Sequence, residues 1–185
     1  MGEILGLEWK NVHFDRQTIE VKRTLTYLPG DGRHACYELH EPKTPAGYRT
    51  TPMSTTVRDI LLIQKERYGT INSHFEPLKG FEDMVFTSKT NKPLNASNIK
   101  DTLNRIIEKI NADHPEQFFE HLTPHGLRHT FATNCIEKGM PPKVLQKILG
   151  HNSMQMTVDL YAHVREDKIR EEMAKVMDMM PDSND

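Results

Sequence analysis

Features that would assign this sequence to a specialised class of protein are nearly all missing. Its only two cysteines, Cys36 and Cys135, lie far apart and form no paired motif, which argues against a disulfide framework and favours reduced thiols in a cytoplasm. No apolar run approaches the roughly 20 residues that a membrane-spanning helix needs. The first residues also lack the charge pattern of a signal peptide, so we expect neither secretion nor a membrane partner.

Net charge is small as well, because 24 lysines and arginines nearly balance 26 aspartates and glutamates, leaving a formal charge of −2. A dedicated nucleic-acid binder is often strongly basic, so this balance weighs against such a protein but leaves room for a local basic face. The remaining features are ordinary. A chain of 185 residues, 36% hydrophobic and 27% charged, suits one soluble domain with a sizeable core.

Alternating apolar residues predict a small sheet in the first third of the chain. From residue 18 to residue 53 we expect a three-stranded antiparallel meander with turns at 29–32 and 44–47. The alternation is carried by Ile19, Val21, Leu25, Tyr27, Ala35, Tyr37 and Leu39. Before the meander, residues 2–9 read as a helical fragment that begins without an N-cap residue.

Helix signals dominate the rest of the chain, which predicts an α+β fold that is mainly helical. Helices are expected to begin at capping or proline residues, namely at Ser54, Ser97, Thr123, Pro141 and Ser153. The fourth of these stops at Gly150. A last apolar stripe marks a C-terminal amphipathic helix and consists of Ile169, Met173, Val176, Met177 and Met180. Residues 181–185 are expected to form a disordered tail.

Two histidines and an arginine fall within the six residues PHGLRH, at 124–129. With Thr123 as the N-cap, His125 and Arg128 are three residues apart and share one face near the start of the helix. The free amides and the dipole of a helix start favour an anion, and the planar guanidinium of arginine matches a phosphate in bidentate fashion. These residues indicate a phosphate site rather than a metal site.

Two other interpretations remain open on the residues alone. His125 and His129 have a workable spacing for zinc ligands, but no glutamate lies between them and Arg128 would repel a cation. The pattern is also compatible with an amphipathic helix that happens to carry surface histidine and arginine, since HxxR by itself is a weak signal.

Four motifs in one order strengthen the phosphate interpretation. GEILGLEWKNV opens the chain, EPKTPAGYRTTPM follows at 41–53, and PHGLRHTFAT is succeeded by KILGHNSMQMTVDLYAHV. This arrangement resembles the C-terminal catalytic domain of the tyrosine recombinase (phage integrase) family, which has a lysine-bearing hairpin, then His-x-x-Arg, Leu-Gly-His and a tyrosine. The resemblance covers nearly all of residues 1–175.

The resemblance implies catalytic roles for five residues. Tyr161 would be the nucleophile that attacks a DNA phosphate, giving a 3′-phosphotyrosyl link and a free 5′-hydroxyl. Arg128, His125 and His151 would act on the phosphate oxygens, with His125 also able to help take the tyrosine proton. Lys43 would give a proton to the leaving 5′ oxygen.

The same resemblance implies the partners. Arg49, which accompanies the lysine in the hairpin, and Lys92 are expected to contact DNA. The substrates would be double-stranded attachment sites of a prophage or another integrative mobile element, and other protomers would dock through the C-terminal helix. No ATP, metal or other cofactor is implied. Action on bacterial DNA predicts a cytoplasmic protein that associates with the nucleoid.

The resemblance also sets an expected domain organisation. Residues 1–180 would form the catalytic domain, while the N-terminal core-binding domain and the family's first catalytic arginine would lie outside this chain, the arginine immediately before Met1. The chain is therefore expected to cleave DNA poorly by itself. The alternatives are a non-catalytic DNA-binding remnant of an integrase, a type IB topoisomerase-like enzyme and a zinc-dependent hydrolase.

Overall fold

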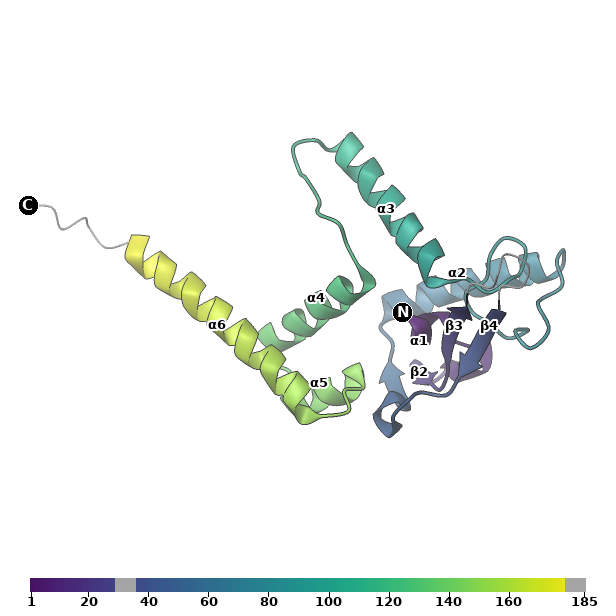
Figure 1. The fold of residues 1–185 in the computed structure, drawn as a ribbon, viewed down its shortest axis with the longest axis horizontal. Coiled ribbons are helices and arrows are strands. Elements are labelled where there is room, and N and C mark those ends of the chain that lie inside the picture. The colour runs from purple at the N-terminus through teal and green to yellow at the C-terminus, as the bar shows by residue number, and fades with distance from the viewer. Residues whose placement is uncertain (29–35, 179–185) are drawn as a thin grey trace, which may run out of the picture. The chain divides into compact units, whose positions relative to one another are not determined.

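The computed structural model describes residues 1–28 and 36–178, and the chain divides into two compact units, Met1–Leu127 and Arg128–Asp185. The first unit holds the strands and three helices, and the second consists of helices, so the predicted α+β, mainly helical class is confirmed (Figure 1). The turn predicted at 29–32 and the tail predicted at 181–185 lie outside the described residues.

The first unit contains two antiparallel sheets rather than one. Strands β1 (Val12–His13), β2 (Thr18–Val21) and β5 (Arg49–Pro52) form the three-stranded sheet, in the order β1-β2-β5. Strands β3 (Thr24–Leu28) and β4 (Cys36–His40) pair separately as a hairpin. The three-stranded meander predicted over 18–53 is therefore wrong in its connections. Alternation reports which face of a strand is buried, and it carries no information about the neighbour with which the strand pairs.

The helices of the first unit begin near the predicted residues, with one correction. In α2 (Thr55–Asn72) the Val57 N–H donates to Ser54 Oγ at 3.3 Å, as the predicted cap requires. Helix α3 (Ala96–Asp113) is capped by Asn95 rather than by Ser97. The backbone N–H groups of Asn95 and Asn98 each donate to the other residue's side-chain oxygen at 2.9 Å, a reciprocal pair that Ser97 does not make.

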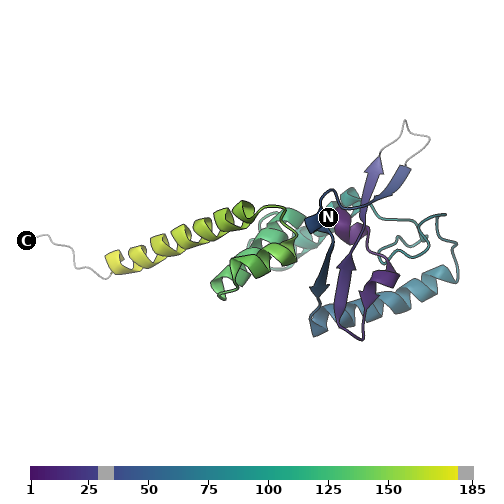
Figure 2. The same ribbon diagram turned by 90° about the horizontal axis from the view of Figure 1, so that it is seen from below.

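The core of the first unit lies between α2 and the strands, and in Figure 2 the axis of α2 lies across the direction of the strands. Its buried members are Leu7, Val12, Met53, Leu61 and Val85. The loop after α2 reaches this core because the Val85 N–H donates to the Leu7 carbonyl at 2.9 Å. The segment that contains the short helix α1 (Gly2–Leu5) is thereby tied to the rest of the unit.

The second unit is a helical cluster that carries three of the predicted catalytic residues. Helix α4 (Pro124–Glu137) begins at the end of the first unit, and the Gly126 N–H donates to Thr123 Oγ1 at 2.9 Å, which confirms Thr123 as its cap. Helix α5 (Pro142–Leu149) ends at Gly150, whose φ of 69° is left-handed and favours glycine. The two helices predicted after Ser153 form one helix, α6 (Met154–Asp178).

The core of the second unit consists of Ala132, Ile136, Leu145 and Leu149, packed against one side of α6. Helices α5 and α6 contact each other along this core (Figure 1). Among the residues that the structure describes, no helix has both the length and the apolar composition that crossing a membrane demands.

Candidate active site

The start of α4 carries His125 and Arg128 as predicted. They lie three residues apart on one helix, His125 exposed and Arg128 half-buried. Residues at this spacing are neighbours on a helix surface, so the imidazole and the guanidinium belong to one face. His129, the second histidine of the zinc interpretation, is exposed on the same helix.

The guanidinium of Arg128 is held by the end of another helix. Its Nη2 donates to the backbone carbonyl of Leu149, the last residue of α5. The last carbonyls of a helix have no partner inside the helix and carry partial negative charge, which suits a guanidinium. Because His151 follows Leu149 by two residues, this contact brings Arg128 and the Leu-Gly-His turn to the same end of α5.

The ring of His151 is fixed from α6. Its Nδ1 lies 3.0 Å from Oγ1 of Thr157, a residue with no exposed surface. The turn is fixed at its backbone too, since the His151 N–H donates to the Gln146 carbonyl at 3.1 Å and Gln146 Nε2 donates to the His151 carbonyl at 3.2 Å. A histidine held in this way presents one ring orientation, which is what a preorganised donor to phosphate needs.

Tyr161 lies on α6, half-buried, with its hydroxyl donating to the backbone carbonyl of Met140. Met140 lies in the link between α4 and α5, and Met140 and Tyr161 border a cavity of about 350 Å³ that Pro141 and Val164 also line. Burial raises the pKa of the Tyr161 phenol above its ordinary value, and the nearby Cys135 raises that pKa further. The hydroxyl is therefore protonated at neutral pH, and it attacks only if a base removes its proton.

The other predicted site residues belong to the first unit. Lys43 is exposed and precedes a single 3-10 turn, η2 (Pro45–Gly47). The guanidinium of Arg49 faces the carboxylate of Glu3. Lys92 is exposed at the end of a turn, where its N–H donates to Ser88 Oγ at 3.1 Å and its carbonyl accepts from the Ser88 N–H at 2.8 Å. DNA contacts by Arg49 and Lys92, and a meeting of all five catalytic residues at one phosphate, stay predictions.

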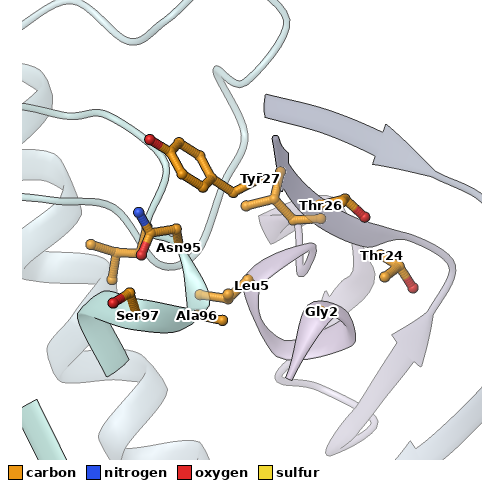
Figure 3. Close-up of a pocket in the computed structure, with 10 residues that line it drawn as sticks. Gly2, Leu5, Thr24, Thr26, Tyr27, Asn95, Ala96 and Ser97 are labelled. Carbon is orange, nitrogen blue, oxygen red and sulfur yellow. The ribbon is translucent and has the colours of Figure 1, made fainter. Parts of the chain in front are cut away.

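A separate cavity of about 410 Å³ lies in the first unit, between α1, β3 and the start of α3. Thr24, Thr26 and Tyr27 of β3 border one side, and Asn95, Ala96 and Ser97 border the other (Figure 3). None of the residues predicted to act in catalysis lines it.

Sequence patterns missed the partners that hold the site residues. Two of them are backbone carbonyls, of Leu149 and Met140, and a carbonyl has no signal in the sequence. Thr157 and Glu3 are side chains within recognised motifs, but their pairing depends on contacts between elements. Across residues 1–28 and 36–178, no group of three or more histidine, cysteine, aspartate or glutamate side chains is placed to hold a metal ion. The expectation of no metal cofactor stays a prediction.

Comparison with known proteins reveals the same family along most of the chain. The model of the phage integrase family matches residues 1–168. The transposase of transposon Tn916 from Enterococcus faecalis is 31% identical over 180 residues, which are 95% of this chain and 42% of that protein. A XerC-like tyrosine recombinase from Caldanaerobacter subterraneus subsp. tengcongensis is 29% identical over 174 residues, 88% of this chain and 42% of that protein.

Solved structures agree with the sequence relatives. The Tn1549 transposon integrase, in complex with transposon right end DNA, matches with a TM-score of 0.75 and 31% identity, over 95% of this chain and 54% of that one. The XerA recombinase matches with a TM-score of 0.58 and 25% identity, over 94% of this chain and 50% of that one. The chain spans less than half the length of these curated relatives. With a family match over most of its residues, the chain belongs to the phage integrase family of tyrosine recombinases.

Proposed function

We propose that residues 1–180 form the catalytic domain of a site-specific recombinase of an integrative mobile element, which cuts and rejoins double-stranded DNA through Tyr161. One observation carries the proposal. The Arg128 guanidinium donates to the carbonyl of Leu149, which precedes His151 by two residues, and Tyr161 lies on the next helix. The relatives support it, because they carry the names transposase and tyrosine recombinase.

In the proposed reaction, the Tyr161 oxygen attacks the scissile phosphorus, so that a P–O bond to tyrosine forms and the bond to the 5′ oxygen breaks. The tyrosine proton goes to a base, for which His125 is the candidate, and Lys43 gives a proton to the leaving 5′ oxygen. The 5′-hydroxyl of a second DNA end then attacks the phosphotyrosine phosphorus and gives its proton to Lys43, while the P–O bond to Tyr161 breaks and the phenolate takes back the proton that His125 held. The strands are exchanged without net hydrolysis because the covalent link retains the phosphodiester energy.

Arg128 and His151 have the task of offsetting the charge that gathers on the nonbridging phosphate oxygens. An arginine stays protonated throughout the physiological pH range. The Leu149 carbonyl orients its guanidinium and Thr157 orients the imidazole of His151 without any help from substrate. Donors that are already oriented need little reorganisation as the transition state forms, and this is the main source of their catalytic effect.

Tyr161 has to change its hydrogen bond before it can attack. Its hydroxyl donates to the Met140 carbonyl, and its raised pKa keeps the proton on the oxygen at neutral pH. DNA binding must therefore bring a base to the phenol and break its hydrogen bond to this carbonyl.

DNA and further protomers are the proposed partners. The solved Tn1549 integrase was in complex with transposon DNA, and this chain is 31% identical to that protein over the matched region. On α6, Ile169 and Met173 are 63% and 51% exposed and lie four residues apart, which gives an apolar face for a second protomer. We place the protein at the bacterial nucleoid, since its substrate would be chromosomal or element DNA.

The test is covalent trapping on DNA whose central sequence is randomised, because the attachment site is not known. Each duplex carries a nick, so that cleavage beside it releases a short oligonucleotide and leaves the protein attached. Because the chain is expected to cleave DNA poorly by itself, protein and duplex are used at high concentration, and we expect a low yield of an adduct that survives denaturation, maps to Tyr161 by mass spectrometry and is absent from Tyr161→Phe. DNA that is cut with no protein attached would indicate a hydrolase, and an adduct in Tyr161→Phe would overturn the proposal. Relaxation of supercoiled plasmid without a paired site would favour a topoisomerase.

A further inference from the structure

Arg49 and Glu3 form a two-fold contact between strand β5 and helix α1. Arg49 Nη1 donates to Glu3 Oε1 at 2.9 Å and Nη2 donates to Glu3 Oε2 at 2.7 Å. The two residues are 46 positions apart, and the side chains are only 13% and 35% exposed for Arg49 and Glu3. Paired hydrogen bonds of this kind fix geometry as well as adding energy, unlike an ordinary exposed ion pair.

Glu3, the carboxylate partner in this contact, lies on a helix that is packed closely against the hairpin. Helix α1 packs with its backbone against β3, and a Cβ at Gly6, just after the helix, would lie 2.8 Å from the Leu25 nitrogen and 2.9 Å from the Arg23 carbonyl oxygen. Only glycine allows that approach. Glu3 is therefore held by a backbone that cannot shift without separating α1 from the hairpin.

The guanidinium end reaches the loop that carries Lys43. Arg49 Nη1 also donates to the Gly47 carbonyl at 3.2 Å, at the end of turn η2. Gly47 in turn lies against Pro42, since a Cβ there would be 2.4 Å from the Pro42 Cβ. Pro42 directly precedes Lys43, so the contacts of Arg49 and Gly47 close the loop around the lysine.

Two further hydrogen bonds close the same loop. The Tyr48 hydroxyl donates to Glu41 Oε2 at 2.6 Å, and the Gly47 N–H donates to the Thr44 carbonyl at 2.9 Å. The backbone of 41–49 is thus a short loop closed by several contacts, and Lys43 is exposed on it. This arrangement differs from the mobile hairpin tip that a lysine in a solvated loop would have.

We propose that Arg49 is a positioning residue for Lys43, acting through Gly47 and anchored by Glu3, and that it is not primarily a DNA contact. The inference rests on the proposed role of Lys43 as the acid that protonates the leaving 5′ oxygen. Such an acid works only within hydrogen-bond reach of the oxygen, and a misplacement of about 1 Å can cost on the order of 10²-fold in rate. Lysine cannot replace Arg49, because an ammonium does not make the forked contact.

The test compares cleavage of ordinary DNA with cleavage of DNA that has sulfur at the 5′ bridging position. A thiolate leaves without being protonated, so this substrate does not need the acid. The variants of the full chain are Lys43→Ala, Arg49→Gln, Arg49→Lys, Glu3→Gln and the Arg49→Gln/Glu3→Gln pair. Single-turnover trapping is measured on both substrates, and the unfolding midpoint of each variant is recorded.

On ordinary DNA we expect Lys43→Ala to lower the trapping rate by about 10²- to 10⁴-fold, the range for removal of a general acid. The Arg49 and Glu3 variants should lower the trapping rate by about 10²-fold. The double variant should be no slower than the slower single variant, since each substitution breaks the same Arg49–Glu3 contact. On the sulfur substrate all of them should return close to the wild-type rate. Arg58→Gln removes an arginine from an exposed pair with Asp59 and serves as the matched control, with no change on either substrate.

The outcomes separate this inference from the proposed function. If Lys43→Ala is restored by sulfur and the Arg49 variants are not, Arg49 does not act through the lysine and the inference fails alone. If Glu3→Gln cleaves ordinary DNA as well as wild type, Arg49 acts as a DNA contact and the inference also fails. If Lys43→Ala is not restored, the lysine is not the acid, and both its proposed role and the inference about Arg49 are overturned, whereas the recombinase proposal still depends on the adduct at Tyr161. Should Arg49→Gln not fold, Arg49→Lys and Glu3→Gln give the same comparison.

Discussion

At the scale of single residues, three of the five predicted catalytic side chains are held by neighbours that have no proposed chemical role. The Leu149 carbonyl holds Arg128, Thr157 holds His151 and the Met140 carbonyl holds Tyr161. All three contacts lie within the second unit. The proposed donors and the nucleophile are therefore oriented by the helical cluster itself, and a substitution that keeps charge but changes shape should be costly.

Arg128→Lys tests this prediction, because it keeps the positive charge and removes the planar guanidinium. The ammonium keeps the charge but cannot hold the Leu149 carbonyl and a phosphate with one planar group, so one oriented donor is lost. We expect the trapping rate to fall by about 10²- to 10³-fold, the range for loss of one such donor. The unfolding midpoint should change little. Arg67→Lys, on the exposed side of α2, is the control, and equal rates for the two variants would contradict the assignment of Arg128.

A second prediction concerns the pH dependence that Tyr161 gives to stability. Burial holds the pKa of the folded phenol above the value of about 10 that applies in the unfolded chain. The unfolded state then loses its proton at lower pH than the folded state. The stabilisation that Tyr161 contributes through this pKa difference is complete below about pH 10 and is lost as pH rises through the folded pKa.

Wild-type protein should therefore lose more free energy of unfolding than Tyr161→Phe between about pH 9 and pH 11. Urea unfolding at several pH values measures the difference. Burial also raises the pKa values of Tyr37 and Tyr68, but both proteins contain these tyrosines and their effect cancels. Parallel pH profiles for wild type and Tyr161→Phe would show that the phenol has the same pKa in both states.

At the scale of elements, the turn between α5 and α6 places His151, and glycine makes that turn possible. Gly150 has a φ of 69°, so an alanine there is strained by roughly 1 kcal/mol. Gly80, with a φ of 87° and open space around it, offers the same strain away from the site. We expect Gly150→Ala and Gly80→Ala to lose similar stability, measured by urea unfolding. Only Gly150→Ala should also reduce trapping, and a comparable reduction in Gly80→Ala would show that general destabilisation is responsible.

Element boundaries were well predicted wherever one local interaction decides them. Ser54 and Thr123 cap their helices as expected, because a side-chain oxygen and a nearby N–H suffice. The start of α3 was misplaced because Asn95 and Ser97 are both good caps, and the reciprocal partner Asn98 decided between them. Strand pairing was misjudged because the break between Val21 and Thr24 leaves the alternation intact. Which strands pair depends on contacts that alternation does not encode.

At the scale of the whole molecule, family motifs predicted the site residues, while their surroundings needed the structure. Tyr161 and His151 could be predicted because the order His-x-x-Arg, Leu-Gly-His, Tyr is a sequence property. The Arg49–Glu3 contact was not, since it joins residues 46 positions apart and neither side chain signals the other. Arg49 was interpreted as a DNA contact for that reason. A basic residue in a motif has no feature that tells a phosphate partner from a carboxylate.

The assembly of protomers on DNA also belongs to this scale, and we expect it to depend on α6. Ile169 and Met173 are exposed on one face, and an apolar face on an otherwise charged helix is a site for protein contact. Exchange of strands needs at least two protomers on DNA, whereas a single protomer can trap a nicked duplex. Ile169→Asp/Met173→Asp should therefore abolish recombination between paired sites and leave trapping near the wild-type rate. Sedimentation on DNA should show the loss of higher complexes.

The control for α6 places the same charge on another exposed aliphatic residue, Ile63→Asp on α2, which is 66% exposed. It should keep both recombination and the higher complexes. If Ile169→Asp/Met173→Asp reduces trapping as much as recombination, the face acts within one protomer, because a purely intermolecular contact cannot affect a reaction that one protomer completes. In that case the partner of α6 would have to be sought within its own chain.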